Sequence, residues 1–129
     1  MLKNGILNPQ ILSLLARVRH TNTLVLADCG FPSWPGIETV DISLIDDVPQ
    51  VAQLFAAIQQ HWKIGQIWMA EEFFDQNAKT VKDRITDLAA PLSIYAEPHV
   101  QFKLRVPKAI GIIRTGDTTQ YANMILESA

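Results

Sequence analysis

Cysteine is almost absent from this sequence: Cys29 is the only one among 129 residues. A single cysteine excludes an internal disulfide framework, so the fold must be stable without such bridges. The opening Met-Leu-Lys-Asn-Gly also lacks the long apolar core of a signal peptide. Both features predict a protein of the reducing cytoplasm.

Long apolar runs and runs of positive charge are missing too. No stretch approaches the roughly 20 apolar residues that a helix needs to cross a bilayer. The formal net charge is −2, and no run of Lys or Arg stands out. The chain therefore lacks the electrostatic footprint of a protein that binds polyanions, and we expect neither nucleic acid nor membrane among its partners.

Residues that hold metals or phosphates are sparse. The three histidines, His20, His61 and His99, share no spacing typical of zinc ligands, so no metal site is predicted. Only six glycines are present, and none belongs to a glycine-rich phosphate loop, which argues against a nucleotide-binding domain. The segment Thr115-Gly-Asp117 indicates a turn rather than a phosphate cradle.

The apolar content, in contrast, is sufficient for one core, since 48% of the residues are hydrophobic. Helices are expected from Asn8-Pro9 to about Arg19, after Asp46-Asp47 to near His61, over 81–88, and from Glu97-Pro98 onward. Short strands are expected over 23–27, 38–42, 67–70, 92–95, 109–113 and 123–126. This alternation predicts a single α/β domain over residues 1–129, a sandwich with a mostly parallel central sheet flanked by helices.

Candidate functional residues follow from that sheet, because ligands collect at the carboxyl ends of parallel strands. Asp28 directly follows a strand, and it is either a ligand-binding carboxylate or a turn former before Gly30. Glu71 and Glu72 are expected to form a solvated strand exit. Cys29 has no evident histidine partner, so we expect it to be a small buried residue.

His20 stands at the junction between the first helix and the first strand. Histidine is the side chain that most readily exchanges protons near neutral pH, which makes it a candidate acid–base group. A histidine in the last turn of a helix also interacts favourably with the helix dipole. Both interpretations of His20 therefore stay open.

A helix beginning near Pro98 places His99 and Lys103 on one face. These two side chains either form one wall of a ligand site or are ordinary surface residues. Tyr121 and Asn123 are separated by one residue, so in an extended segment they would share a face. Hydrogen-bonding groups of this kind suit a polyhydroxylated ligand.

Several motifs occur together in one order along nearly the full length of the chain. They are the opening Leu2-Lys-Asn-Gly-Ile-Leu-Asn8, His20-Thr21 before a strand that ends in Asp28, His99-x-x-Phe-Lys103, Ile113-Arg-Thr-Gly-Asp117 and Tyr121-Ala-Asn123. Their order and spacing resemble the D-ribose pyranase and L-fucose mutarotase family. The resemblance implies an isomerase, a mutarotase that interconverts pyranose and furanose forms, or anomers, of a free monosaccharide such as D-ribose.

The resemblance also implies a site and an assembly. The position that matches His20 is the catalytic acid in the family, and the sugar site is lined by the positions that match Asp28, His99, Lys103, Tyr121 and Asn123. No cofactor is expected, since opening a sugar ring requires only proton transfer. The family likeness further implies a cytoplasmic ring-shaped homo-oligomer, a decamer, with sites between subunits.

Four aromatic residues support an oligomer. Phe31, Trp34, Phe73 and Phe74 lie in or beside predicted loops, where aromatic side chains favour interfaces. Trp34 is also expected to supply an apolar face for the sugar ring.

Two departures from the family pattern keep alternatives open. Arg19 and Asn22 replace the glycine and aspartate that usually flank the histidine, and the added cation favours a rival interpretation, a non-catalytic sugar-binding or regulatory module. Phe31-Pro32 resembles the fucose branch of the family, whereas His99-x-x-Phe-Lys103 resembles the ribose branch. Ribose and fucose are therefore both candidate substrates, with L-fucose mutarotase as the alternative activity.

Overall fold

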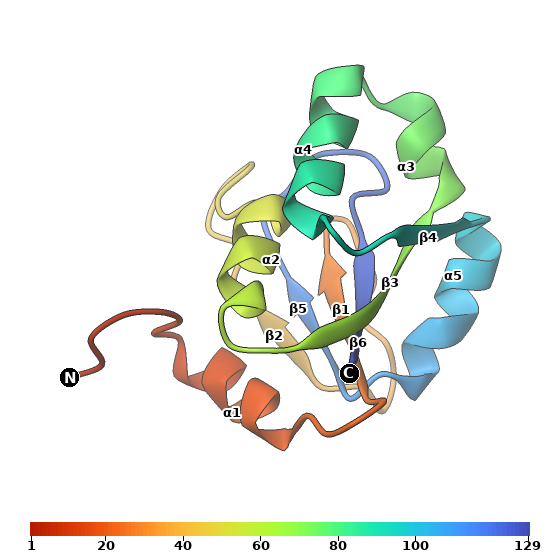
Figure 1. Cartoon of the computed structure of the whole chain (residues 1–129). Coiled ribbons are helices and arrows are strands. Elements are labelled where there is room, and N and C mark those ends of the chain that lie inside the picture. Colours follow the sequence, from red (N-terminus) through yellow and green to blue (C-terminus); the bar gives the residue numbers. More distant parts are fainter.

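The computed structural model describes residues 1–129 (Figure 1). The helices are α1 (Pro9–Arg17), α2 (Val51–Gln59), α3 (Glu71–Gln76), α4 (Lys79–Ala89), α5 (His99–Arg105) and the short 3-10 helix η1 (Val106–Lys108). The strands are β1 (Thr23–Ala27), β2 (Thr39–Asp41), β3 (Ile64–Ala70), β4 (Ile94–Glu97), β5 (Gly111–Arg114) and β6 (Met124–Ser128). None of the helices combines the length and hydropathy required to cross a bilayer.

All six strands form one sheet with the order β2-β5-β1-β6-β3-β4. The pairs β1/β5, β2/β5 and β3/β4 are parallel, whereas β6 is antiparallel to both of its neighbours, β1 and β3. Five strands therefore point the same way and one points back, so the predicted mostly parallel sheet is confirmed.

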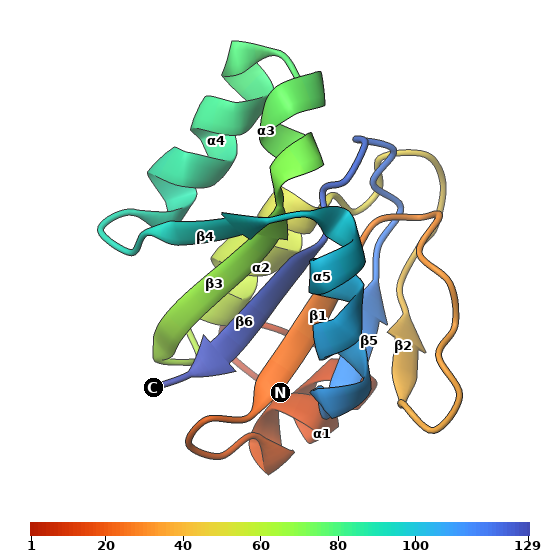
Figure 2. The same ribbon diagram turned by 90° about the vertical axis from the view of Figure 1, so that its right-hand side faces the viewer.

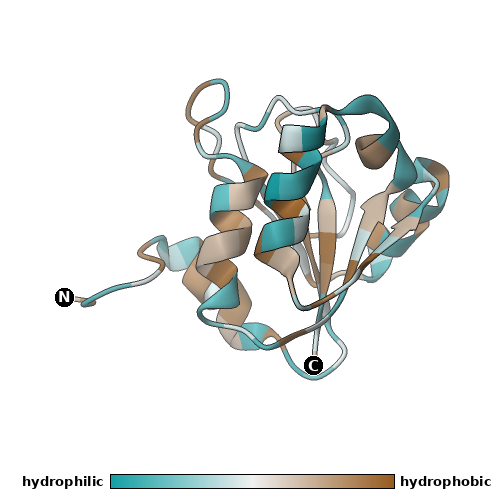
Figure 3. Cartoon of the chain, turned by 45° about the horizontal axis from the view of Figure 1, so that its top comes forward, coloured by the Kyte–Doolittle hydropathy of each residue, from teal (hydrophilic) through white to brown (hydrophobic).

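The sheet is covered on both faces, as predicted for a sandwich. Leu24 and Leu26 of β1 belong to a core of 21 buried residues shared with α1, α2, α3 and α4. Val25 and Ala27 alternate with them and pack into a second cluster of 8 buried residues with α5 and η1. Figures 1 and 2 show α2 and α4 on one side of the sheet and α5 on the other. Figure 3 shows the central strands in the brown tones of hydrophobic residues, with teal on the outer helices and loops.

Local signals explain where the first helix begins and ends. The Asn8 side chain accepts a hydrogen bond from the Ile11 amide at 2.9 Å, and Pro9 occupies the first turn, where its missing N–H costs nothing. The helix ends at Arg17, two residues earlier than expected, and Val18 already has an extended backbone. His20 consequently lies in the turn after α1, outside the last helical turn, so an interaction with the helix dipole does not account for it.

Two element boundaries differ from the sequence-based expectation. Glu97 is the last residue of β4, and Pro98 is the N-cap of α5, so this helix begins at His99. Glu71 and Glu72 form the first turn of α3 instead of a solvated strand exit. Two carboxylates are favourable there, because the amino end of a helix carries partial positive charge. At 6 residues this helix is too short to show a periodic apolar pattern in the sequence.

Candidate functional site

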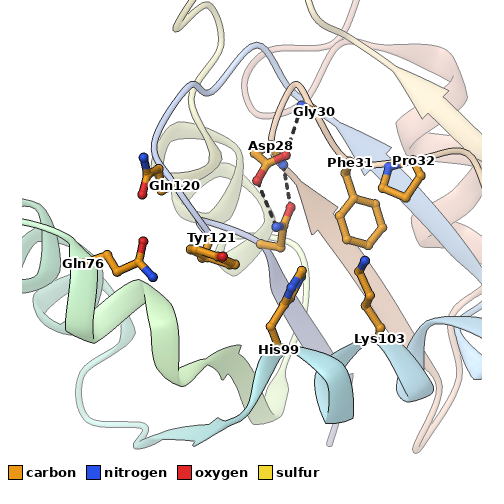
Figure 4. A pocket seen from close by; sticks show the side chains of 10 residues that line it. Asp28, Gly30, Phe31, Pro32, Gln76, His99, Lys103, Gln120 and Tyr121 are labelled. Atoms are coloured by element: carbon orange, nitrogen blue, oxygen red, sulfur yellow. Dashed lines mark hydrogen bonds between the residues drawn. The ribbon is translucent and has the colours of Figure 1, made fainter.

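The main candidate site is a cavity of about 450 Å³ beside the carboxyl end of β1 (Figure 4). It is lined by Asp28, Gly30, Phe31, Pro32, Gln76, His99, Lys103, Gln120, Tyr121 and Asn123. All five residues predicted to line a sugar site are in this set. Their meeting follows from the topology, since β1, the start of α5 and the turn before β6 converge at the same edge of the sheet.

Asp28 and Asn123 form the floor of the cavity. Asn123 Nδ2 donates to Asp28 Oδ2 at 2.9 Å, and the Asp28 amide donates to Asn123 Oδ1 at 2.8 Å. The Gly30 amide also donates to Asp28 Oδ1 at 3.0 Å. Burial raises the pKa of the Asp28 carboxyl, and the bonds from Asn123 and Gly30 offset part of that rise. Asp28 is thus a carboxylate oriented by hydrogen bonds in a partly desolvated position. It is suited to accepting a hydrogen bond from a hydroxyl or to exchanging a proton.

His99 faces Asp28 and Asn123 from the first turn of α5. Its backbone amide donates to the Glu72 carboxylate, at 3.0 Å to Oε2 and 3.2 Å to Oε1, so α3 holds the start of α5 in place. The imidazole contacts the Tyr121 ring edge to face, with centroids 5.0 Å apart at 82°. Its Nε2 is buried and has no hydrogen-bond partner in the chain. Because this nitrogen belongs to a residue that lines the cavity, it is available to form a hydrogen bond with a ligand.

The electrostatics of the cavity favour a neutral ligand. Burial lowers the pKa of His99, and the nearby Lys103 ammonium lowers it further, so the imidazole is neutral at pH 7. The Asp28 carboxylate and the Lys103 ammonium then balance each other. A phosphate would meet little net positive charge here, whereas an uncharged sugar needs none.

Free hydrogen-bonding groups surround this centre. The side chains of Lys103, Tyr121, Gln76 and Gln120 line the cavity, and none of them makes a hydrogen bond within the chain. Figure 4 shows Gln76 and Gln120 on one side of Tyr121, and Phe31, Pro32 and Lys103 on the opposite side of the site. The cavity thus offers several unpaired donors and acceptors next to an apolar wall, which is the composition of a site for a polyhydroxylated ring.

The backbone around Tyr121 differs from the predicted extended segment. Tyr121 has a φ of 56°, in the left-handed region that a bulky residue rarely adopts, and β6 begins only at Met124. The preceding carbonyl, that of Gln120, accepts a hydrogen bond from Asn77 Nδ2 at 2.9 Å. Asn77, at the end of α3, thus holds the turn through which Tyr121 and Asn123 reach the same cavity. The two residues do not alternate along a strand.

The segment Thr115-Gly-Asp117 supports the site from behind. The Asp117 carboxylate is 4% exposed and accepts from the Val51 amide at 2.9 Å and the Thr119 amide at 2.8 Å. It therefore caps α2 and fixes the turn that leads to Tyr121. A Cβ on Gly116 would lie 2.4 Å from the Ile45 carbonyl, so only glycine fits there. The segment is an irregular loop and not a regular turn, and its role is structural.

His20 is the one predicted site residue that lies away from the cavity. It is exposed and precedes β1, whereas Asp28 follows β1. The 5 residues of β1 alone separate these two ends by roughly 16 Å, at about 3.3 Å per residue. Within one chain the His20 imidazole cannot reach a ligand held between Asp28 and His99.

Three smaller expectations are wrong. Cys29 is exposed, and desolvation together with the Asp28 and Asp46 carboxylates raises the pKa of its thiol. Phe31 and Phe73 are 4% and 0% exposed, so they serve the core of this chain and are not free for an interface. Trp34 stacks behind Phe31 at 5.8 Å and 25°, and the apolar wall of the cavity is formed by Phe31 and Pro32.

Five further residues line the cavity without having been predicted from the sequence as part of the site: Gly30, Phe31, Pro32, Gln76 and Gln120. Four of them are within four residues of Asp28 or next to Tyr121, so proximity in sequence could have indicated them. Gln76 has no such signal, because α3 enters the site only through the tertiary fold. No group of three or more His, Cys, Asp or Glu side chains is placed to hold a metal ion.

Comparisons with known proteins agree with this geometry. The model of the RbsD / FucU transport protein family matches residues 1–129. The chain is 38% identical over 128 residues to a D-ribose pyranase of Bacillus cereus, which covers 99% of this chain and 97% of the relative.

Solved structures give the same result. The structure of Bacillus subtilis RbsD complexed with D-ribose is similar, with a TM-score of 0.92 and 32% identity over 100% of this chain and 98% of that chain. The fucose mutarotase of Streptococcus pneumoniae in complex with L-fucose has a TM-score of 0.70 and 23% identity over 95% and 92% of the two chains, which shows a shared fold. Because the family match spans the whole sequence and relatives this similar cover it, the chain belongs to the RbsD / FucU transport protein family.

Proposed function

We propose that the protein is a sugar mutarotase of the D-ribose pyranase type, an isomerase that interconverts the ring forms of a free monosaccharide. The observation that carries this proposal is the cavity at Asp28, His99 and Tyr121. It is close to neutral, rich in unpaired hydrogen-bonding groups and bordered by an apolar wall. D-ribose is the first candidate substrate, because the structural relative at 32% identity holds D-ribose.

The reaction requires only proton transfers. A base takes the proton of the anomeric hydroxyl while an acid protonates the ring oxygen, the bond from the anomeric carbon to the ring oxygen breaks, and an aldehyde forms. Reclosure through another hydroxyl changes the ring size, and reclosure on the other face changes the anomer. General acid–base catalysis contributes about 10²–10⁴-fold to such a step, and no cofactor is needed.

Each lining group has a defined task in this proposal. The Asp28 carboxylate, oriented by Asn123, accepts a hydrogen bond from a sugar hydroxyl or takes up its proton. The neutral His99 presents its unpaired Nε2 as a hydrogen-bond acceptor or proton acceptor. Lys103 and Tyr121 donate to further hydroxyls.

His20 completes the site from a second copy of the chain. It lies at the amino end of β1, and the cavity lies at the carboxyl end. If His20 acts on the sugar, the amino-end surface of one subunit must meet the cavity of the next. Such a head-to-tail contact joins two different surfaces and closes into a ring when the rotation permits. This arrangement supports the predicted ring-shaped homo-oligomer, whose decameric size and cytoplasmic location stay predictions.

The outer face of α5 is the surface best suited to receive that neighbour. Val100 and Leu104 are one helical turn apart, are 69% and 65% exposed, and directly follow the cavity residues His99 and Lys103 in sequence. Exposed apolar pairs of this kind gain about 1.5–3 kcal/mol per side chain when they are fully buried.

Two rival functions differ from this proposal in one measurable respect. A non-catalytic sugar-binding module would bind ribose without changing its rate of ring exchange, and an L-fucose mutarotase would accelerate exchange of fucose and leave ribose unchanged. Saturation-transfer NMR on unlabelled D-ribose and L-fucose reports these rates directly. We expect the protein to accelerate exchange between ribose ring forms, and exchange rates equal to those in buffer for both sugars would refute the proposal.

A further inference from the structure

The guanidinium group of Arg114, at the end of β5, bonds to the loop that follows β1 and to the end of the neighbouring strand β2. Its Nε donates to the Phe31 carbonyl at 2.9 Å, and its Nη2 donates to Ser33 Oγ at 3.1 Å. Its Nη1 contacts Asp41 Oδ2 at 3.0 Å, at the end of β2. The Arg114 side chain is only 16% exposed and its bond to the Phe31 carbonyl is partly buried, whereas the bonds to Ser33 and Asp41 lie at the surface.

The loop of residues 31–36, which we call the wall loop, has few other attachments. It contains no helix or strand. Its remaining backbone hydrogen bonds are local, from the Phe31 amide to the Asp28 carbonyl at 3.3 Å and from the Ile37 amide to the Trp34 carbonyl at 3.2 Å. Apart from the packing of Phe31 and Trp34 on the second buried cluster, the two bonds from Arg114 are what ties the wall loop to the sheet.

The wall loop supplies the apolar side of the cavity. Phe31 and Pro32 line it, and Figure 4 shows both residues on the same side of the site as Lys103. Trp34 stacks against the Phe31 ring from behind. The carbonyl that Arg114 holds belongs to Phe31 itself, so a shift of the guanidinium would move this wall directly.

We propose that Arg114 is a positioning residue that sets the apolar wall of the site and thereby the affinity for the sugar ring. The inference rests on the proposed function for the identity of the ligand. Arginine suits this task because its planar fork donates in several fixed directions at once, which a lysine ammonium on a flexible stem cannot reproduce. The C–H face of a sugar ring packs on such a wall, while its hydroxyls meet the polar side.

The test compares Arg114→Lys with Arg17→Lys. Arg17 is a matched control, because it donates to Glu38 at 2.7 Å but has a half-exposed side chain and no contact with the wall loop. For Arg114→Lys we expect ribose binding about tenfold weaker, as for the loss of one hydrogen bond to a charged group. The exchange rate at saturating ribose should change by less than about threefold, since the groups that move protons are untouched. Ser33→Ala should shift affinity the same way by a smaller factor.

A second readout follows the wall loop without any sugar. In protein labelled with 5-fluorotryptophan, the ¹⁹F resonance of Trp34 should shift or broaden in Arg114→Lys, while those of Trp62 and Trp68 stay in place. An unchanged Trp34 resonance together with parent affinity would overturn the proposal. So would equal losses of affinity and saturated rate. If the parent protein exchanges neither sugar, the proposed function fails, yet the Trp34 resonance still decides whether Arg114 positions the loop.

Discussion

Asn123 and Asp28 are linked by two reciprocal hydrogen bonds, from Asn123 Nδ2 to the Asp28 carboxylate at 2.9 Å and from the Asp28 amide to Asn123 Oδ1 at 2.8 Å. Asn123 is 3% exposed, and its two bonds orient the Asp28 carboxylate within the chain itself. The remaining lone pairs of Asp28 are those available to a sugar hydroxyl. The same two residues therefore contribute both to the stability of the fold and to ligand recognition.

Asn123→Asp should damage the site while keeping the shape of the side chain. It replaces the Nδ2 donor with a second carboxylate oxygen beside Asp28, and two carboxylates that share a site hold a proton between them at a raised pKa. We expect the exchange rate at neutral pH to fall about tenfold or more, the cost of a lost bond to a charged group. Part of the rate should return as the pH is lowered, because the shared proton restores a donor. An activity profile parallel to that of the parent would contradict this account of the pair.

His99 should make stability depend on pH in the mildly acidic range. Burial lowers its pKa below the ordinary 6.5, so the unfolded chain takes up the proton first. The stability contributed by neutral His99 is present above that ordinary value and is lost as the pH falls through the folded-state value. We expect the Tm of the parent to drop more than that of His99→Gln between about pH 7.5 and about pH 5.

Differential scanning calorimetry of both proteins over this range is the direct check. The raised pKa of Asp28 acts with the opposite sign, since its contribution is lost as the pH rises, but burial, its largest cause, is present in both proteins. Equal pH slopes would show that His99 is not desolvated in the folded protein.

Asp117 should be the most costly single carboxylate to remove. Asp117→Ala leaves the buried amide of Val51 and the partly buried amide of Thr119 without acceptors. We expect a loss of about 2–4 kcal/mol in the free energy of unfolding, combining a lost cap with unsatisfied donors. Urea denaturation measures it. The neighbouring Thr118→Ala, at an exposed side chain that bonds to Asp47 at 2.8 Å, should cost less than about 1 kcal/mol and serves as the control.

Helix α5 is the part of the site that the sequence predicts best. Pro98 marks the start of that helix, and the spacing of four residues between His99 and Lys103 places both side chains in one cavity, as found. The strand at 23–27 is also predictable from the sequence, because the run is short and apolar. In the structure every residue from Leu24 to Ala27 is buried. These features depend on neighbours within one turn or one strand.

The features that sequence reasoning missed depend on distant partners. The left-handed backbone at Tyr121 is held by Asn77, 43 residues from the carbonyl that it bonds. The sequence predicts a solvated Glu72, because no residue near it in sequence indicates its bond with the His99 amide. The family likeness implied a role for His20, but only the structure places that residue at the opposite end of β1 from the cavity.

The proposed role of the outer face of α5 as a subunit contact can be tested by introducing a charged side chain there. Val100→Asp and Leu104→Asp each place a carboxylate in the proposed contact, and we expect either change to shift assembly toward monomers at micromolar concentration, because burying an unpaired charge is costly. Multi-angle light scattering reports the mass. Leu44→Asp, at a residue 75% exposed in the loop before α2, is the matched control and should keep the parent's mass. If Leu44→Asp lowers the mass while Val100→Asp and Leu104→Asp keep it, the interface lies at that loop and not at α5.

Mixed oligomers test the central claim, that each site joins His20 of one subunit to the cavity of another. His20→Ala and His99→Ala are expected to be inactive alone, each lacking one half of every site. Co-expressed in equal amounts and assembled at random, they should form about a quarter of the sites with both halves intact, as head-to-tail contacts require. Saturation-transfer NMR on D-ribose should therefore show about a quarter of the parent's exchange rate per subunit. Exchange no faster than that of the separate variants would contradict the account, because it would mean that both histidines must come from the same chain.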